Sequence, residues 1–168
     1  YIVRPIYNLS GMGVGSTIKY LTPNDVSMIP PGYFWCEVFE GAQYSVTYTF
    51  IHDVNPYWKP IKCWEGIRSS DEMFRFERWK RSYHYPTIPR VLNELSDVNL
   101  INVEFIGDKV IEVHLRDTPD PEYDEIIPIW EDTQKDIDKY LKMGYTYQNS
   151  YEDADGFLEI PRLGFMTK

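Results

Sequence analysis

The amino-acid sequence predicts an α+β protein built from antiparallel sheets with packed helices. Apolar and polar residues alternate through several stretches, as they do in strands that bury one face, and 43–51 is the clearest example. Two more alternating stretches flank a Gly-Asp turn at 107–108 and predict a hairpin. Helical patterns are mixed in among the strands rather than alternating with them, which favours α+β over a doubly wound sheet.

The first half of the chain is dominated by strands. A strand at 1–7 leads into a glycine-rich loop at 8–16. Thr22 is a suitable N-cap for a short helix at 23–28, because its hydroxyl can accept a hydrogen bond from a backbone N–H. A Pro-Pro-Gly turn precedes the next strand. The further strands expected in this half are 33–39, 43–51 and 58–65.

The second half combines helices with the hairpin. The polar stretch 68–82 is expected to be partly helical, and 88–95 is expected to form a helix before the hairpin. A proline- and acid-rich stretch at 119–128 predicts a loop, because proline cannot donate to a β-ladder. A helix is expected at 131–143, where a glycine ends it. The chain finishes in a predicted strand at 156–165.

Composition limits the classes of function. The chain has 168 residues, of which 43% are hydrophobic, and no apolar run reaches membrane-spanning length. The net charge of −9 argues against nonspecific nucleic-acid binding, which requires a basic face for the phosphates. Residues 97–159 are strongly acidic and suit a divalent cation. Cys36 and Cys63 lie in apolar strand patterns without metal-type spacing, so we expect buried thiols in a cytoplasmic protein.

The hairpin carries the strongest candidate site. One face of its strands bears charged residues, namely Glu104, Glu112, His114 and Arg116. The other face bears apolar residues, namely Val103, Phe105, Ile111, Val113 and Leu115. If the loop has an odd number of residues or a bulge, Glu104 and Glu112 lie opposite one another with β-carbons about 5 Å apart, and a cation such as magnesium would relieve their repulsion. A solvated hairpin face with scattered charges is the alternative.

A second candidate is the glycine-rich loop near the start of the chain. Arg4 lies in the preceding strand, and Gly11, Gly13 and Gly15 follow at alternate positions with Ser16 after them. Glycine allows backbone N–H groups to approach phosphate oxygens closely, and a nearby cation offsets the phosphate charge. The pattern matches neither a Walker A motif nor a dinucleotide-binding motif, so a plain hairpin turn is the alternative.

The order of these motifs resembles that of the ATP-grasp superfamily. From Tyr1 to Arg116 the chain contains a basic strand, a glycine loop, the strand end Glu37-Val38-Phe39-Glu40-Gly41, an alternating strand and an acidic hairpin. The resemblance implies an ATP-grasp-like fold, with a glycine-loop and hinge-strand lobe at 1–57 and a metal-site lobe at 58–168. It also implies a fragment of a longer chain that lacks its N-terminal domain.

The resemblance implies a role for each matching residue. Arg4 and Arg116 would neutralise phosphate charge during catalysis. The metal ligands would be Glu104, Glu112 and His114. The nucleotide would be held by the loop, the hinge and a flanking residue, which are Gly11, Gly13, Gly15, Ser16, Glu37, Val38, Phe39 and Gln43. Lys62 and Arg68, from the basic stretch 58–90, are further candidates for contact with the nucleotide or an acidic substrate.

Three positions depart from the family pattern. Arg4 replaces the usual lysine, which keeps the charge but changes its geometry. Gln43 stands where a ribose-binding carboxylate is common, and its side chain still accepts a hydrogen bond. His114 replaces the usual asparagine, and imidazole suits manganese or zinc better than magnesium.

The predicted function is that of an ATP- and magnesium-dependent ligase, which activates a carboxylate as an acylphosphate for attack by an amine or thiol. The expected substrate is a small-molecule or peptide carboxylate, with ATP and Mg²⁺ (or Mn²⁺) as cofactors and no nucleic-acid or membrane partner. Such an enzyme needs positioning and charge neutralisation rather than a nucleophilic side chain. The fragment alone is expected to be inactive. The alternative is a non-catalytic nucleotide-binding or structural module with a degenerate site.

Overall fold

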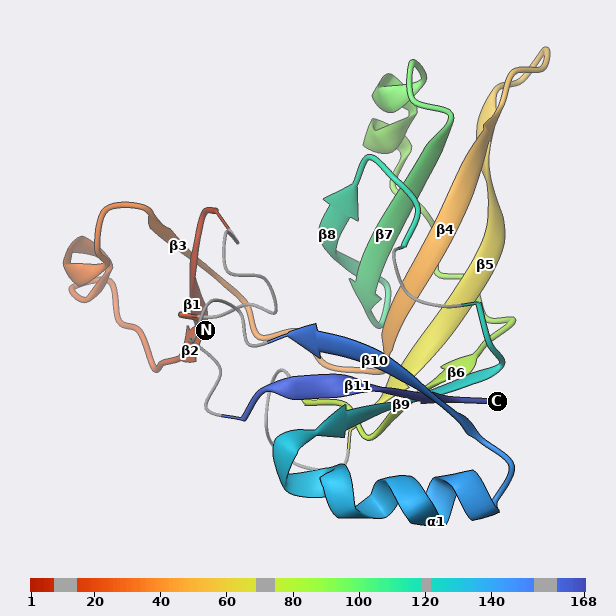
Figure 1. Ribbon diagram of the computed structural model, residues 1–168. Coiled ribbons are helices and arrows are strands. Elements are labelled where there is room, and N and C mark those ends of the chain that lie inside the picture. The colour runs from red at the N-terminus through yellow and green to blue at the C-terminus, as the bar shows by residue number, and fades with distance from the viewer. Residues whose placement is uncertain (8–14, 69–74, 119–121, 153–159) are drawn as a thin grey trace.

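The computed structural model describes residues 1–7, 15–68, 75–118, 122–152 and 160–168. Strands predominate and form two antiparallel sheets, a small one of three strands and a large one of eight (Figure 1). Few helices accompany them, so the predicted α+β class with antiparallel sheets is confirmed. None of the helices in these residues is long and apolar enough to cross a membrane.

The small sheet contains the first three strands. Its central strand β1 (Ile2–Pro5) pairs with β2 (Thr17–Ile18) on one side and with β3 (Tyr33–Cys36) on the other. A 3-10 helix, η1 (Val26–Met28), lies between β2 and β3. Val3 is the one buried apolar residue among the described residues of this sheet. The small sheet therefore has very little core of its own.

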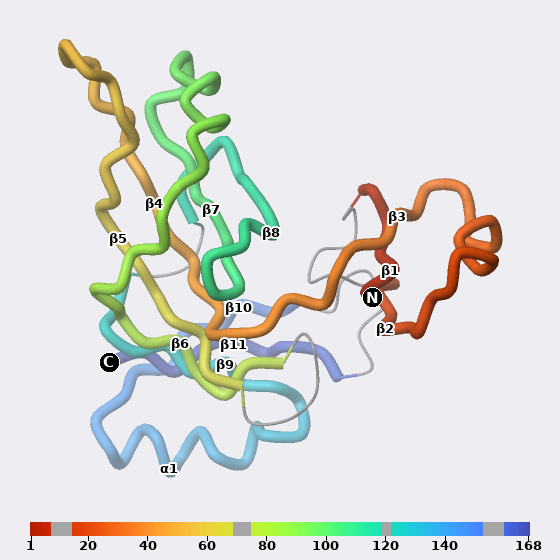
Figure 2. The backbone as a smooth tube through the Cα atoms, turned by 180° about the vertical axis from the view of Figure 1, so that it is seen from behind, coloured from red at the N-terminus to blue at the C-terminus, as the bar shows by residue number. Residues whose placement is uncertain are grey.

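The large sheet has the strand order β10-β11-β9-β6-β5-β4-β7-β8, and all neighbouring strands are antiparallel. Its strands are β4 (Gln43–Ile51), β5 (Tyr57–Ile67), β6 (Arg78–Arg81), β7 (Leu100–Ile106), β8 (Lys109–His114), β9 (Glu125–Trp130), β10 (Thr146–Glu152) and β11 (Arg162–Thr167). Figures 1 and 2 show the small sheet beside this large one, joined to it by the segment from β3 to β4.

One face of the large sheet carries the hydrophobic core. At the β4 end, residues of β4, β5 and β7 form a buried cluster, which consists of Val46, Tyr48, Phe50, Trp58, Cys63, Ile101, Val103 and Phe105. The segment 88–98 includes the 3-10 helix η2 (Arg90–Leu95), and its apolar side chains pack against this cluster. Cys63 is buried as predicted, whereas Cys36 is only half-buried.

The other end of the same sheet is covered by a helical segment. The 3-10 helix η3 (Glu131–Asp136) continues into α1 (Ile137–Lys142), which runs beside this end of the sheet (Figure 1). Ile137 and Tyr140 pack on Ile127, Ile129 and Met166 of the sheet. Gly144 follows with φ +86°, a left-handed conformation that ends the helix at little steric cost.

The opposite face of the large sheet is mixed. Trp64, Ile126 and Phe165 form a second small apolar cluster with Trp79, near the centre of the sheet. Toward β8 the same face becomes polar, because Gln43, Ser45 and Thr47 of β4 alternate with the core residues of that strand. This polar part of the sheet, formed by β4, β7 and β8, holds the predicted metal ligands.

Several predicted elements require correction. The stretch expected to be partly helical contains β6, in which Trp79 packs inward while Lys80 is exposed. The loop predicted at 119–128 ends in β9, which includes Pro128. This is tolerated because β6 pairs with β9 only at Glu125 and Ile126, so no strand requires an N–H from Pro128 on that side.

Smaller differences concern the ends of elements. The Thr22 hydroxyl donates to the Asp25 side chain, and the helix that follows is the short η1. The predicted helix at 88–95 is the 3-10 helix η2, and the strand predicted at 33–39 ends at Cys36. Strand β10 was not predicted. The last strand begins at Arg162, and part of its predicted range lies outside the described residues.

Candidate metal centre

The β7–β8 hairpin places Glu104 directly opposite Glu112. The turn itself has two residues, Gly107 and Asp108, and a β-bulge between the Glu104 and Phe105 pairings supplies the extra residue, Ile111. Because of the bulge, Val110 packs against the core rather than Ile111. The predicted apolar face is therefore wrong at Ile111, and also at Leu115, which is 59% exposed.

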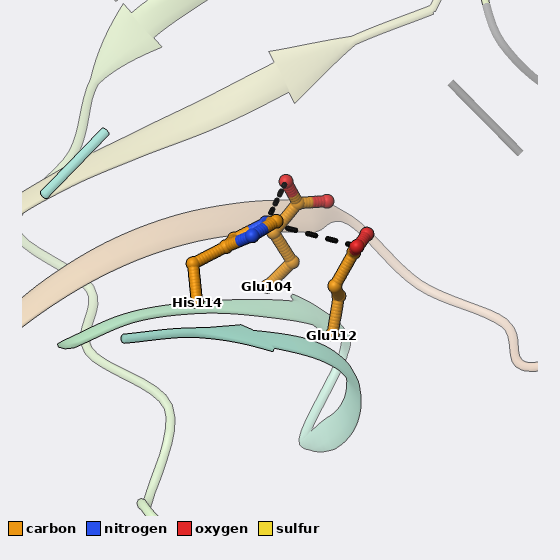
Figure 3. Close-up of side chains that lie close together, drawn as sticks. All are labelled: Glu104, Glu112 and His114. Atoms are coloured by element: carbon orange, nitrogen blue, oxygen red, sulfur yellow. Dashed lines mark ion pairs between the residues drawn. The ribbon is translucent and has the colours of Figure 1, made fainter. Parts of the chain in front are cut away.

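Glu104, Glu112 and His114 converge on one side of the hairpin (Figure 3). One potential ligand atom from each residue lies within 4.8 Å of the others. The His114 Nε2 atom is 3.8 Å from Glu104 Oε1 and 3.9 Å from Glu112 Oε1, and all three side chains are half-buried. These residues are called the acidic trio below.

The acidic trio has an excess of negative charge. Interaction with Glu104, reinforced by the charge of Glu112, raises the pKa of His114, while burial and the charge of Arg116 oppose the increase. The trio therefore attracts positive charge, and its two carboxylates favour the protonated form of His114 over the neutral form. Two carboxylates and an imidazole form a donor set that fits manganese, zinc or iron.

Gln43 and Arg68 adjoin the acidic trio. The Gln43 Nε2 atom donates to Glu104 Oε2 over 3.2 Å, and an Arg68 Nη2 atom donates to Gln43 Oε1 over 2.6 Å. The Arg68 guanidinium also lies over the Phe76 ring, 5.1 Å from its centroid. The structure thus brings together five of the predicted site residues, the trio with Gln43 and Arg68.

Lys62 belongs to a separate network on the same face. Its ammonium contacts Asp117 at 2.6 Å and also pairs with Glu122. Burial would lower the pKa of Lys62, but the two carboxylates outweigh burial and raise it. Asp117 also accepts a hydrogen bond from the buried Thr47, at 2.9 Å. Lys62 is therefore already neutralised.

The sequence interpretation missed this polar network around Asp117. Asn102, which is buried, donates to Ser45 at 3.0 Å, and the network continues through Thr47 to Asp117. The alternation of β4 was a usable signal, since it placed Ser45 and Thr47 on the polar face. Asp117 had no such signal, because it lies beyond the end of β8.

The two catalytic candidates occupy different places. Arg116 is exposed and donates to the backbone carbonyl of Asp117 at 2.9 Å, and its charge acts on His114. Arg4 lies in β1 of the small sheet, where its guanidinium is over the Phe34 ring at 5.7 Å. Among the described residues, Arg4 makes no hydrogen bond or ion pair with the acidic trio.

The predicted hinge residues join the two sheets. Glu37, Val38 and Phe39 lie between the end of β3 and the start of β4, outside any strand. Glu37 and Val38 are exposed, and Phe39 is half-buried. Farther along this linker, the Ala42 carbonyl accepts a hydrogen bond from Gly107 at 2.8 Å. The linker therefore contacts the turn of the hairpin that carries the acidic trio.

The glycine loop is described only at its end. Gly11 and Gly13 lie outside the described residues. Gly15 has φ +85° and is followed by the half-buried Ser16 and then by β2. Gly15 and Ser16 therefore lie directly before a strand of the small sheet.

Comparison with protein-family models, curated proteins and solved structures gave no match to this chain.

Proposed function

We propose that this chain binds a divalent transition-metal ion through Glu104, Glu112 and His114. The observation that carries the proposal is the convergence of these three side chains within 4.8 Å, with two carboxylates paired across a hairpin. Like charges directly opposite in a sheet are unfavourable, and a divalent cation removes that penalty. Because His114 supplies an imidazole nitrogen, Mn²⁺ or Zn²⁺ is expected to bind more tightly than Mg²⁺.

We further propose that the bound ion serves an ATP-dependent ligase that activates a carboxylate as an acylphosphate. Two arrangements support this proposal. The hinge residues connect two sheets, and the same linker contacts the hairpin that carries the acidic trio. The exposed guanidinium of Arg116 follows directly after β8 and can meet an anionic group.

In this proposal the residues position and neutralise charge. The metal ion would supply charge neutralisation for the transferred phosphoryl group. Glu104, Glu112 and His114 would hold the ion, while Arg116 would orient an anionic substrate group by charge-assisted hydrogen bonds. No covalent intermediate on a side chain is required.

Calorimetric titration of the chain with MnCl₂ and MgCl₂ tests metal binding. We expect Mn²⁺ to bind and Mg²⁺ to bind more weakly. Glu112→Gln, which removes a ligand charge at constant volume, should abolish the Mn²⁺ heat. Glu94→Gln, an exposed substitution in η2 on the other face, is the matched control and should leave it unchanged. Failure of the wild-type chain to bind either ion would overturn the proposal.

The ligase step requires its own test. Titration of the chain with ATP in saturating Mn²⁺ is expected to show metal-dependent nucleotide binding, and an assay of ADP release with a panel of carboxylates and amines then tests for turnover. A non-catalytic metal-binding module is the second candidate, which the position of Arg4 over Phe34 in the small sheet favours. Metal binding without any effect of ATP would identify that module.

A further inference from the structure

The Gln43 side chain connects Arg68 to the acidic trio. It donates through Nε2 to Glu104 and accepts through Oε1 from Arg68. Glu104 is a carboxylate that can only accept and Arg68 a guanidinium that can only donate, so their chemistry determines which end of the amide faces each neighbour. A reversed amide would place its NH₂ group against a cation and its oxygen against an anion.

This arrangement divides the two oxygens of Glu104 between different neighbours. Oε2 accepts from Gln43 at 3.2 Å, whereas Oε1 faces His114 Nε2 at 3.8 Å. The carboxylate is therefore held in one rotation, with Oε1 turned toward the other members of the acidic trio. Hydrogen bonds of this kind to a ligating carboxylate orient it and adjust its affinity for a metal.

Arg68 is itself held in place on two sides. Its guanidinium donates to Gln43 at 2.6 Å and lies over the Phe76 ring. Its contact with a neutral amide differs from those of Lys62 and Arg78, which pair with carboxylates. A cation at Oε1 polarises the Gln43 amide and strengthens the bond that Nε2 donates to Glu104.

We propose that Gln43 and Arg68 are positioning residues of the metal centre, which act on the ion through Glu104. This inference rests on the metal site proposed above. In this role neither residue is a ligand of the ion. Gln43 orients the Glu104 carboxylate, and Arg68 orients and polarises Gln43.

Mn²⁺ affinity of two variants, measured by calorimetry, tests this role. Gln43→Met keeps the length of the side chain but removes both hydrogen bonds, and Arg68→Gln removes the guanidinium. We expect each variant to bind Mn²⁺ about 10-fold more weakly, the lower end of the range for outer-shell partners of metal ligands. Gln148→Met in β10 and Arg90→Gln in η2 are matched controls away from the trio and should bind as the wild type does.

The double variant separates a relay from two unrelated effects. If Arg68 acts through Gln43, the Gln43→Met/Arg68→Gln protein should bind Mn²⁺ no more weakly than Gln43→Met alone. Arg68→Lys, which keeps the charge, should recover part of the lost affinity. Thermal unfolding of each metal-free variant shows whether that variant is folded. A change in Kd is then compared only among variants that fold.

Three outcomes are informative. Weakened and non-additive Mn²⁺ binding supports the relay. Wild-type affinity in both single variants, or losses that simply add, would overturn it while leaving the metal site intact. Absence of Mn²⁺ binding by the wild-type chain would overturn the metal site itself, and the relay with it.

Discussion

Individual side chains on the polar face of the large sheet form two contrasting charge arrangements. Around Lys62, one ammonium meets two carboxylates, and Thr47 donates a further hydrogen bond to one of them. In the acidic trio, the partners that the described residues give the two carboxylates are an imidazole and a neutral amide. The Lys62 network already contains a cation, whereas the acidic trio has an excess of negative charge. An added cation is therefore expected to bind selectively to the trio.

Gln43→Glu tests this lack of positive charge. The new carboxylate replaces an amide that donates to Glu104 at 3.2 Å, so it adds a third negative charge to the site. We expect a lower unfolding temperature for the metal-free variant and a larger Mn²⁺-induced rise in that temperature than for the wild type. Differential scanning fluorimetry with and without MnCl₂ measures both. An equal rise in the two proteins would show that the new carboxylate does not adjoin a bound ion.

Asp117 predicts a pH dependence of stability. Burial would raise its pKa, but hydrogen bonds from Lys62, Thr47 and the Thr118 N–H outweigh burial and lower the pKa below its usual value. A carboxyl whose folded pKa is lowered stabilises the protein above its unfolded pKa, and this contribution is lost as the pH falls through the folded pKa. Asp117→Asn should therefore be less stable at pH 7, by about 1 kcal/mol because the carboxylate is partly exposed.

Urea unfolding between pH 7 and pH 2 checks the Asp117 prediction. The difference in free energy of unfolding between wild type and Asp117→Asn should shrink toward the acidic end of this range. Asp97→Asn, at an exposed position, is the control and should show little difference at any pH. A difference for Asp117→Asn that stays constant with pH would show that its effect is steric rather than electrostatic.

At the level of elements, strong local patterns were predicted and weak ones were not. Strand β4 has the predicted bounds, because its alternation is regular over its whole length. The hairpin was also expected, and the bulge alternative fits the observed pairing. Strands β6 and β10 are rich in polar residues and show no clear alternation of apolar and polar residues. They are therefore identified by their pairing with neighbouring strands and not by a local sequence pattern. The position of the bulge follows from core packing of Val110, which no local pattern contains.

The linker between the sheets depends on a close approach of two glycines. Gly41 has φ +123°, and a β-carbon there would lie 3.1 Å from the backbone of Gly107. We expect Gly41→Ala to lower the free energy of unfolding by about 2 to 3 kcal/mol, through backbone strain together with the clash. Gly32→Ala is the control, since Gly32 also has positive φ but open space around it. Its cost should be about 1 kcal/mol.

Chemical denaturation of the two glycine variants distinguishes these contributions. Equal losses would mean that backbone conformation alone accounts for the cost and that the linker can move away from the hairpin turn. A larger loss in Gly41→Ala is the expected result, and it combines the greater backbone strain at φ +123° with the clash against the hairpin turn.

On the scale of the whole molecule, the two sheets are very unequally supported. The large sheet buries apolar clusters on both faces and is covered by η2 at one end and by η3 and α1 at the other. The small sheet buries Val3 alone among its described residues. Composition indicated a chain with a substantial core. How that core is divided between the two sheets depends on long-range strand pairing, so local sequence patterns could not predict it.

This inequality predicts two levels of hydrogen-exchange protection. Amides in the centre of the large sheet, in β4, β5 and β7, exchange only when the core opens, so their protection should approach the global free energy of unfolding. Amides of β1, β2 and β3 have few buried neighbours and should exchange through local opening at a much lower free energy. Hydrogen–deuterium exchange followed by mass spectrometry resolves the two groups at the level of peptides.

Denaturant provides the control for the exchange prediction. Exchange from the large sheet should accelerate with low concentrations of urea, because global unfolding exposes much surface, whereas exchange from the small sheet should be nearly independent of urea. Mn²⁺ should protect peptides of β7 and β8 more than those of β10 and β11, since the acidic trio lies on the former pair. Equal protection of both sheets would show that the small sheet unfolds only together with the large one, and that its stability comes from contact with it.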